Sequence, residues 1–249
     1  MSDKVLIVTG GSRGIGAATA TIAGSRGWRV AVNYAQNEEA AASVVRAIAD
    51  AGGEAIAVKA DVSIEADVLR LFETVDTAFG RLDALVNNAG IVGMKARVDE
   101  MDAARLERMM QVNVVGPILC AREAVRRMST RHGGRGGMIV NVSSVAAVLG
   151  SACEYVDYAA SKGAIDTFTI GLAREIATEG VRVNAVRPGT VDTEIHASGG
   201  QPDRAARVAP QIPMKRPGRT EEIAHAILWL LSDEASYTTG AILNVSGGR

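Results

Sequence analysis

The 249-residue sequence has few cysteines and histidines, which limits the metal and redox chemistry it can support. Cys120 and Cys153 are the only two cysteines, too few for a disulfide framework or a cysteine-rich metal site. The three histidines, at positions 132, 196 and 225, are too scattered to give a zinc-binding spacing. We therefore expect no metal ion at the centre of its function.

The sequence also lacks an excess of charge and a long apolar run. It carries 27 Lys and Arg against 28 Asp and Glu, a formal net charge of −1, so no global field favours nucleic acid or an anionic membrane. Nowhere do about 18 apolar residues follow one another, and the first residues lead into a strand pattern without a sustained apolar region. We expect a soluble, cytoplasmic protein that acts on a small molecule and binds neither nucleic acid nor membrane.

Seven short apolar runs alternate with helical patterns along the chain. The runs are rich in Val, Ile and Ala and mostly unbroken, which is typical of strands covered on both faces. Helical patterns lie between them, for example from Glu38 to Ala51 and from Ile64 to Phe79, the latter with Asp61 and Ser63 as candidate caps. We predict strands at residues 4–9, 29–34, 54–59, 84–87, 137–142, 181–186 and 241–245.

Regular strand and helix alternation implies right-handed crossovers and a parallel sheet. The length and the 47% hydrophobic content suit one core, so we predict an α/β fold with a single domain over residues 1–249. Its seven-stranded parallel sheet is doubly wound, with helices on both faces. The longest helical patterns run over residues 102–128 and 155–179. Residues 193–219, with two adjacent glycines and four prolines, look irregular and are a candidate lid over a substrate.

A glycine-rich turn follows the first predicted strand. It reads Gly10-Gly11-Ser12-Arg13-Gly14-Ile15-Gly16, and we expect a helix directly after it. Glycine allows positive φ and close backbone approach, so the turn can present N–H groups at a helix N-terminus to a phosphate. Such turns also serve only to pack a helix on a sheet, and the spacing differs from GxGxxG. Its place at the start of the alternating pattern favours a dinucleotide site.

Tyr158 and Lys162 are four residues apart in a predicted helix, so both side chains lie on one face. A phenol has a reference pKa of about 10 and is a poor acid or base near neutral pH unless a nearby cation stabilises its phenolate. Lys162 is placed to supply that cation. Taken alone, the pair fits an ordinary surface pair on an amphipathic helix better.

Six motifs in one order change that interpretation. They are Thr9-Gly-x-x-x-Gly-x-Gly16, Asn87-Asn88-Ala89-Gly90, Asn113, Ser143-Ser144, Tyr158-x-x-x-Lys162 and Pro188-Gly189. With these motifs, nearly the whole chain resembles the classical short-chain dehydrogenase/reductase family. The resemblance implies a Rossmann-type fold and hydride transfer between a nicotinamide cofactor and a carbonyl or secondary alcohol. In character the chain is most similar to 3-oxoacyl-(acyl-carrier-protein) reductases and to sugar dehydrogenases such as glucose 1-dehydrogenase, which the motifs do not separate.

The resemblance implies four catalytic residues. Tyr158 is the expected general acid in carbonyl reduction, and Lys162 is expected to lower the pKa of Tyr158 and to bind the ribose of the cofactor. Ser144 is expected to polarise the substrate carbonyl. Ser143 takes that role if the one extra residue, which we place within residues 151–157, lies elsewhere. Asn113 is expected to hold a water that links Lys162 to solvent, with a buried structural amide as the alternative.

The remaining motif positions are implied to line the cofactor. Asp61 and Val62 match the pair that meets the adenine, although Asp61 can equally be a helix cap. Residues 88–90 match the segment beneath the adenosine ribose, and Pro188, Gly189, Val191 and Thr193 match the segment beside the nicotinamide carboxamide. The implied cofactor-binding residues are Gly10, Gly11, Ser12, Arg13, Gly14, Ile15, Gly16, Tyr34, Ala35, Asp61, Val62, Asn88, Ala89, Gly90, Tyr158, Lys162, Pro188, Gly189, Val191 and Thr193.

The end of the second predicted strand indicates which nicotinamide cofactor binds. An NAD-preferring site places an acidic residue there, but the sequence reads Asn33-Tyr34-Ala35-Gln36 and has no acid before Glu38. Arg13 is placed to face a 2′-phosphate, and a guanidinium pairs more strongly with a phosphate than with a hydroxyl. We therefore predict NADP (NADPH) over NAD.

A nucleotide-sensing or scaffold protein that kept this fold is the non-enzymatic alternative. Such a protein has no need of Tyr158 and Lys162 together, so the intact set favours an enzyme. The segment from Glu221 to Val245 resembles the family's last helix and strand, which commonly pack against another subunit. We expect a homotetramer, although these apolar residues can instead only close the monomer core. Glu154, His196 and Gln201 are candidates for a polar substrate pocket.

Overall fold

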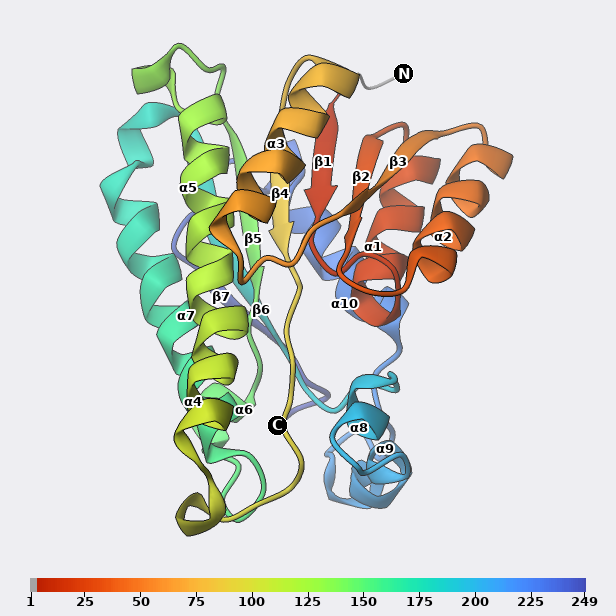
Figure 1. The fold of residues 1–249 in the computed structure, drawn as a ribbon, viewed down its shortest axis with the longest axis vertical. Coiled ribbons are helices and arrows are strands. Elements are labelled where there is room, and N and C mark those ends of the chain that lie inside the picture. Colours follow the sequence, from red (N-terminus) through yellow and green to blue (C-terminus); the bar gives the residue numbers. More distant parts are fainter. Residues whose placement is uncertain (1–3) are drawn as a thin grey trace.

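The computed structural model describes residues 4–249, apart from the side chain of His196. One sheet of seven parallel strands runs through the molecule in the order β3-β2-β1-β4-β5-β6-β7 (Figure 1). Each strand overlaps one of the predicted ranges, and the doubly wound α/β fold is confirmed. The strands are β1 (Val5–Val8), β2 (Arg29–Tyr34), β3 (Glu54–Lys59), β4 (Ala84–Asn87), β5 (Gly137–Val142), β6 (Val181–Pro188) and β7 (Ile242–Val245).

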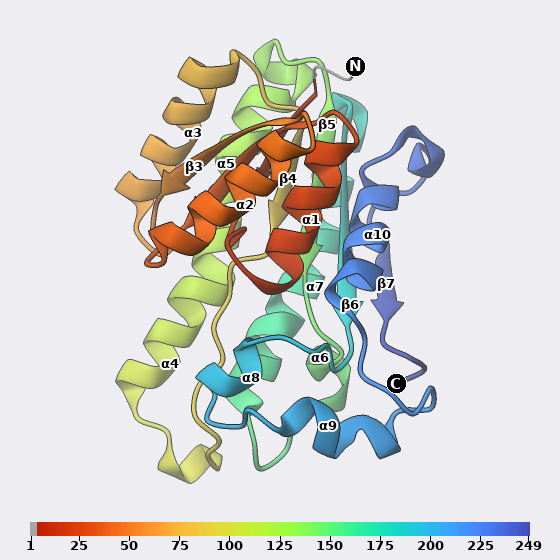
Figure 2. The same cartoon turned by 90° about the vertical axis from the view of Figure 1, so that its right-hand side faces the viewer.

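Helices cover both faces of the sheet. α1, α2 and α10 pack on one face, and α3, α5 and α7 pack on the other (Figures 1 and 2). The α-helices are α1 (Gly14–Ser25), α2 (Glu38–Asp50), α3 (Glu65–Phe79), α4 (Ala103–Met110), α5 (Gly116–Met128), α6 (Ala146–Leu149), α7 (Val156–Glu175), α8 (Ile195–Ser198), α9 (Arg204–Val208) and α10 (Thr220–Leu230). Shorter turns are η1 (Val98–Glu100), η2 (Gln111–Val115), η3 (Thr130–His132), η4 (Ala177–Glu179), η5 (Ala209–Gln211) and η6 (Asp233–Ala235).

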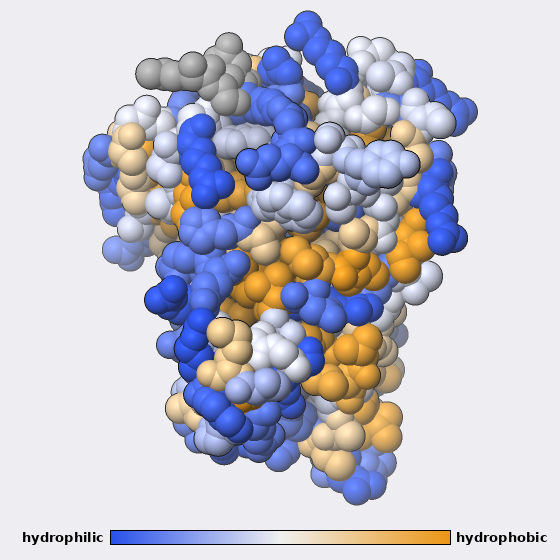
Figure 3. All heavy atoms as spheres, turned by 180° about the vertical axis from the view of Figure 1, so that it is seen from behind, coloured by the Kyte–Doolittle hydropathy of each residue, from blue (hydrophilic) through white to orange (hydrophobic). Residues whose placement is uncertain are grey.

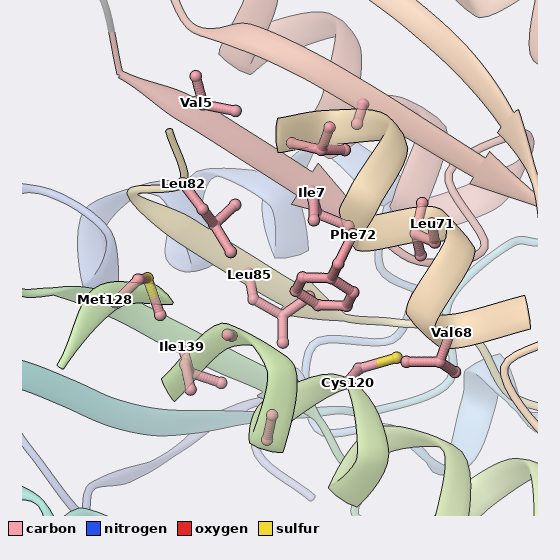
Figure 4. Packing of buried hydrophobic residues seen from close by; sticks show 14 of the residues in the cluster. Val5, Ile7, Val68, Leu71, Phe72, Leu82, Leu85, Cys120, Met128 and Ile139 are labelled. Atoms are coloured by element: carbon pink, nitrogen blue, oxygen red, sulfur yellow. The ribbon is translucent and has the colours of Figure 1, made fainter. Parts of the chain in front are cut away.

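The central strands are unbroken apolar runs because helices cover both of their faces, and the core on the α3 and α5 side illustrates this. Phe72 of α3 lies over Ile7 and Leu85, from the neighbouring strands β1 and β4, and all three side chains are fully buried (Figure 4). Cys120 of α5 belongs to the same cluster. Burial raises the pKa of its thiol to about 12, so this cysteine is an inert packing residue.

The start of α3 differs from the prediction. Its N-cap is Ile64, and neither Asp61 nor Ser63 caps the helix. The Asp61 carboxylate instead accepts hydrogen bonds from the Ser63 backbone N–H at 2.9 Å and from the Ser63 hydroxyl at 2.6 Å. This local turn, typical of Asp and Ser before a helix, holds Asp61 at the end of β3.

Three longer segments are more finely divided than the sequence predicts. The range 102–128 holds α4, a π-helical turn (η2) and α5, with Asn113 inside the turn. The range 155–179 holds α7 and η4. The candidate lid, residues 193–219, is not irregular throughout because it contains α8, α9 and η5.

Within residues 4–249, no helix is both long enough and apolar enough to cross a membrane.

Candidate active site

A cleft of about 620 Å³ lies at the carboxyl ends of the strands. The strand order reverses between β1 and β4, and such a switch point is where open α/β sheets bind ligands. The loops after six strands contribute to the cleft because parallel strands all end at the same edge. Their lining residues include Arg13 after β1, Tyr34 and Ala35 at the end of β2, Asp61 and Val62 after β3, Ala89 and Gly90 after β4, Ser144 after β5, and Pro188, Gly189, Thr190, Val191 and Thr193 at the end of β6.

The glycine-rich turn adopts conformations that only glycine takes without strain. Gly10 has φ +60° and Gly14 has φ +54°. A Cβ on Gly14 would lie 3.5 Å from Cγ2 of Thr193 across the cleft, so a side chain there would fill the space. The turn therefore leaves room for a phosphate beside the N-terminus of α1.

Two of the predicted cofactor residues do not line the cleft. A Cβ on Gly16 would lie 2.4 Å from the Gly10 carbonyl oxygen and 2.5 Å from Nδ2 of Asn88, so this glycine lets α1 pack closely. Gly11 donates its N–H to the Asn33 carbonyl at 2.8 Å. The structure assigns both glycines to the packing of the turn, whereas the other predicted cofactor residues lie in the cleft.

Asn88 holds the glycine-rich turn in place through hydrogen bonds of its side chain and backbone. Its Nδ2 donates to the carbonyl oxygens of Thr9 at 2.9 Å and of Gly10 at 3.0 Å. The backbone N–H groups of Asn88 and Ala89 both donate to the Thr9 hydroxyl at 3.0 Å. The Asn-Asn-Ala-Gly segment thus fixes the geometry of the glycine-rich turn besides lining the cleft.

Arg13 and Tyr34 lie at one end of the cleft, where strand β2 stops. The Arg13 side chain is 58% exposed and forms an ion pair with Glu194 of the lid at 3.7 Å. Tyr34 is buried and brings no carboxylate. The neighbouring Asn33 has a structural task, since its side chain accepts from Gly10 N–H at 3.2 Å and donates to the Ala60 carbonyl at 2.9 Å.

Arg108, which was not among the predicted site residues, reaches Asp61 at the same edge from α4. Its guanidinium donates to the Asp61 carboxylate at 3.1 Å and to the Ser63 hydroxyl at 2.7 Å. Burial raises the pKa of Asp61, but the hydrogen bonds from Ser63 and Arg108 outweigh burial and keep this pKa below its ordinary value. Asp61 is therefore an oriented anion near neutral pH.

Tyr158 and Ser144 face one another in the cleft. Burial raises the pKa of the Tyr158 phenol above its ordinary value, while a side-chain hydrogen bond with Ser144 acts in the opposite direction. Ser143 lies in the cleft wall but turns its hydroxyl to the Lys162 carbonyl at 3.2 Å. Of the two serines, Ser144 is thus the one that can share a substrate oxygen with Tyr158.

Lys162 lies beside Tyr158 on α7, with Nζ 5.7 Å from the centre of the Tyr158 ring. Nζ donates to the Val142 carbonyl at 2.7 Å. Burial lowers the pKa of Lys162 to about 8, against the opposing charge of Asp166. In the protein alone, burial of the phenol dominates the Tyr158 pKa and raises it; the lowering by Lys162 remains a prediction for the complex with the cofactor.

Asn113 is fully buried and does not line the cleft. Its Nδ2 donates to the Ile91 carbonyl at 2.9 Å and its Oδ1 accepts from the Ile91 N–H at 2.8 Å. A Cβ on Gly90 would lie 3.3 Å from Asn113 Oδ1 and 3.6 Å from Lys162 Nζ, so the three residues meet at one point. These hydrogen bonds hold the amide in place beside the lysine, and both predicted roles of Asn113 are compatible with that position.

Two further arginines that line the cleft were not predicted. Arg204 comes from α9, and Arg249 follows β7. Glu154 lies in the cleft as expected, whereas Gln201 is buried behind Tyr155. The side chain of His196 lies outside the described residues. In the part of the chain that the structure describes, no cluster of three His, Cys, Asp or Glu side chains is suited to a metal ion.

The chain is similar to known oxidoreductases over its whole length. A family model described as Enoyl-(Acyl carrier protein) reductase matches residues 10–249. The sequence is 55% identical to the uncharacterized oxidoreductase YgfF of Escherichia coli (strain K12), covering 98% of this chain and 99% of that protein. It is 40% identical to glucose 1-dehydrogenase 2 of Bacillus subtilis (strain 168), covering 100% and 95%. A solved mutant of a Serratia marcescens short-chain dehydrogenase/reductase superimposes with a TM-score of 0.90 at 37% identity, covering 98% of this chain and 97% of that one.

Proposed function

The chain belongs to the classical short-chain dehydrogenase/reductase family, and from this premise we propose that it is an NADP-dependent oxidoreductase acting on a carbonyl and secondary alcohol pair. One observation supports the proposal above the others. The hydroxyls of Ser144 and Tyr158 and the ammonium of Lys162 converge on one cleft beside a glycine-rich helix N-terminus. A scaffold protein has no use for this set.

Tyr158 is the proton donor in this proposal. Its raised pKa keeps the phenol protonated near neutral pH, as a general acid for carbonyl reduction must be. A nicotinamide held in this cleft would supply the hydride for the carbonyl carbon. Tyr158 gives its proton to the carbonyl oxygen, which Ser144 holds by a second hydrogen bond, and the resulting phenolate regains a proton from solvent.

Lys162 has two tasks in this proposal. Its Nζ lies close enough to Gly90 to reach the ribose of a nucleotide bound along residues 88–90. As a cation it also stabilises the phenolate that remains when Tyr158 has given up its proton. The Asn113 side chain exchanges two hydrogen bonds with the backbone of Ile91 beside this lysine. Asn113 is therefore proposed to assist the return of a proton to Tyr158 by holding the surroundings of Lys162 in place.

NADP rather than NAD is the proposed cofactor because Arg13 lines the same cleft as Tyr34, at the end of β2, and Tyr34 stands where an NAD-preferring site has a carboxylate. Its adenine is proposed to lie by Asp61 and Val62, and its nicotinamide by residues 188–193. As for the substrate, 3-oxoacyl-(acyl-carrier-protein) and sugar carbonyls are both open, the latter favoured by the glucose 1-dehydrogenase among the relatives. We further propose a cytoplasmic homotetramer.

The test is NADPH oxidation by the purified chain with a broad panel of aldehydes and ketones, repeated with Tyr158→Phe. This change removes only the hydroxyl, so turnover should fall by about 10² to 10⁴ while the NADPH dissociation constant stays nearly the same. Tyr237→Phe is the matched control because Tyr237 is fully exposed. Near-normal turnover in Tyr158→Phe would remove this tyrosine from the mechanism.

A further inference from the structure

Glu154 and Arg204 form an ion pair inside the substrate end of the cleft. Glu154 lies in the loop before α7, four residues ahead of Tyr158, and Arg204 begins α9 in the lid. Arg204 Nη1 lies 2.6 Å from Glu154 Oε2, and the two side chains are only 15% and 21% exposed. A charged pair is thus part of the cleft wall where a substrate would lie.

The loop that carries Glu154 is held in a strained conformation. Ser151 and Cys153 have φ of 49° and 60°, in the left-handed region that side chains rarely adopt. The Glu154 carbonyl is fixed by a hydrogen bond from the Ala96 N–H at 3.1 Å. Strain of this kind persists only where the surroundings enforce it and gathers at functional sites, so the position of Glu154 is imposed by the fold.

The lid is fastened to the same loop from the other side. Gln201 donates to the Tyr155 hydroxyl, and Arg207 donates to the Gln201 amide oxygen. The Arg204 guanidinium also lies over the Tyr155 ring, with Cζ 5.2 Å from the ring centre. The lid elements α8 and α9 therefore sit against the carboxyl edge of the sheet, as Figure 2 shows, with Arg204 held at the cleft.

The pair keeps unused hydrogen-bonding capacity. A guanidinium has five N–H donors and a carboxylate has about four acceptor sites. Among residues 4–249, the only polar contact of either side chain is this one ion pair, and Nη1 makes no well-directed hydrogen bond. Spare donors on Arg204 and spare acceptor sites on Glu154 are therefore side by side.

The sign of the charges selects the ligand. Glu154 already neutralises Arg204, so a substrate carboxylate would meet repulsion from one partner and a substrate cation would meet repulsion from the other. A hydroxyl suits both partners because it donates to the carboxylate and accepts from the guanidinium. Resting on the proposed function, we infer that the substrate is uncharged and carries a hydroxyl besides its reacting carbonyl, and that Glu154 and Arg204 bind this hydroxyl.

Three ketones of one ring size test the inference, with NADPH as the reductant. They are cyclohexanone, 4-hydroxycyclohexanone and 4-oxocyclohexanecarboxylate. We expect kcat/KM for the hydroxyketone to exceed that for cyclohexanone by about tenfold to a hundredfold, the effect of a hydrogen bond to a charged group. The carboxylate should be the poorest of the three.

Variants assign the preference to the pair. Arg204→Met and Glu154→Ala should each reduce the ratio of the two kcat/KM values toward unity. Arg204→Lys should restore part of the ratio because it keeps the cation. Arg131→Met is the control, since Arg131 is 76% exposed and lies before β5, at the opposite edge of the sheet.

The outcomes separate the inference from the proposed function. Equal kcat/KM values for cyclohexanone and the hydroxyketone would overturn the inference alone, as would a preference for the carboxylate or a ratio unchanged in both variants. The inference would also be overturned if the protein reduced other carbonyls of the panel but none of these three ketones. An absence of turnover with every carbonyl in the broad panel would instead overturn the proposed function.

Discussion

At the scale of single residues, Lys162 has an unusual environment for a lysine, because it is only 5% exposed. Burial lowers its pKa from the ordinary 10.5 to about 8. Between those two values the unfolded chain binds a proton that the folded chain has released. Stability contributed by this residue therefore rises with pH across that window.

Lys162→Met should remove this dependence because methionine does not titrate. In the protein without cofactor, the stability of the variant relative to the parent should fall by about 2 kcal/mol between about pH 7 and about pH 9.5. Urea unfolding at several pH values measures the difference. The exposed Lys59→Met is the control, and an equal trend in both variants would contradict the assignment to Lys162.

Also at the scale of single residues, Arg13 and Tyr34 are expected to determine the preference for NADPH over NADH. NADPH should bind more tightly than NADH by about tenfold to a hundredfold, the usual effect of one charge-assisted contact. Tyr34→Asp should shift preference toward NADH, since a carboxylate repels the 2′-phosphate and accepts from ribose hydroxyls. Fluorescence titration gives the four dissociation constants, and equal affinities in the parent would mean that Arg13 does not meet the phosphate.

At the scale of elements, the close approach of α1 to the turn after β1 depends on Gly16. Gly16→Ala would place a Cβ 2.4 Å from the Gly10 carbonyl oxygen, so α1 must shift. We expect a loss of about 1 to 3 kcal/mol in unfolding free energy together with weaker nucleotide binding.

Gly171→Ala in α7 is the matched control for this prediction. A Cβ there meets nothing within 4 Å, and the site is exposed. Alanine should therefore stabilise that helix by up to about 1 kcal/mol and leave nucleotide affinity unchanged. Thermal unfolding with and without NADPH compares the two variants, and a neutral result for Gly16→Ala would show that the turn adapts easily.

At the scale of the whole molecule, one face of the chain remains apolar. Figure 3 shows apolar residues gathered across the middle of the face on which α10 and β7 lie. Trp229 of α10 is 40% exposed, and Ile242, Leu243 and Val245 of the edge strand β7 are only half-buried. An apolar edge strand of this kind is usually covered by another element.

A homotetramer is the expected assembly, and light scattering at micromolar concentrations should give the mass of four chains. Trp229→Asp should lower that mass because it places a charge on the apolar face. Ile64→Asp is the control, since Ile64 is also exposed but lies at the start of α3. A monomeric mass for the parent chain would refute this prediction.

Local features of the chain were readable from the sequence alone. The seven strands follow from short apolar runs, and the shared helix face of Tyr158 and Lys162 follows from their four-residue spacing. The glycine-rich turn between β1 and α1 follows from residues that allow positive φ. Each of these properties depends on neighbours within one element, so periodicity and residue type were sufficient.

Tertiary structure alone decided the rest. Arg204 meets Glu154 across 50 positions of sequence, and Arg108 meets Asp61 across 47. No local pattern encodes such pairs, because they depend on how the lid and α4 pack against the sheet. The same holds for the pKa of Lys162. A lysine in an unfolded chain has its ordinary pKa, and the lowering by burial arises only when the folded β5 and α7 enclose the side chain.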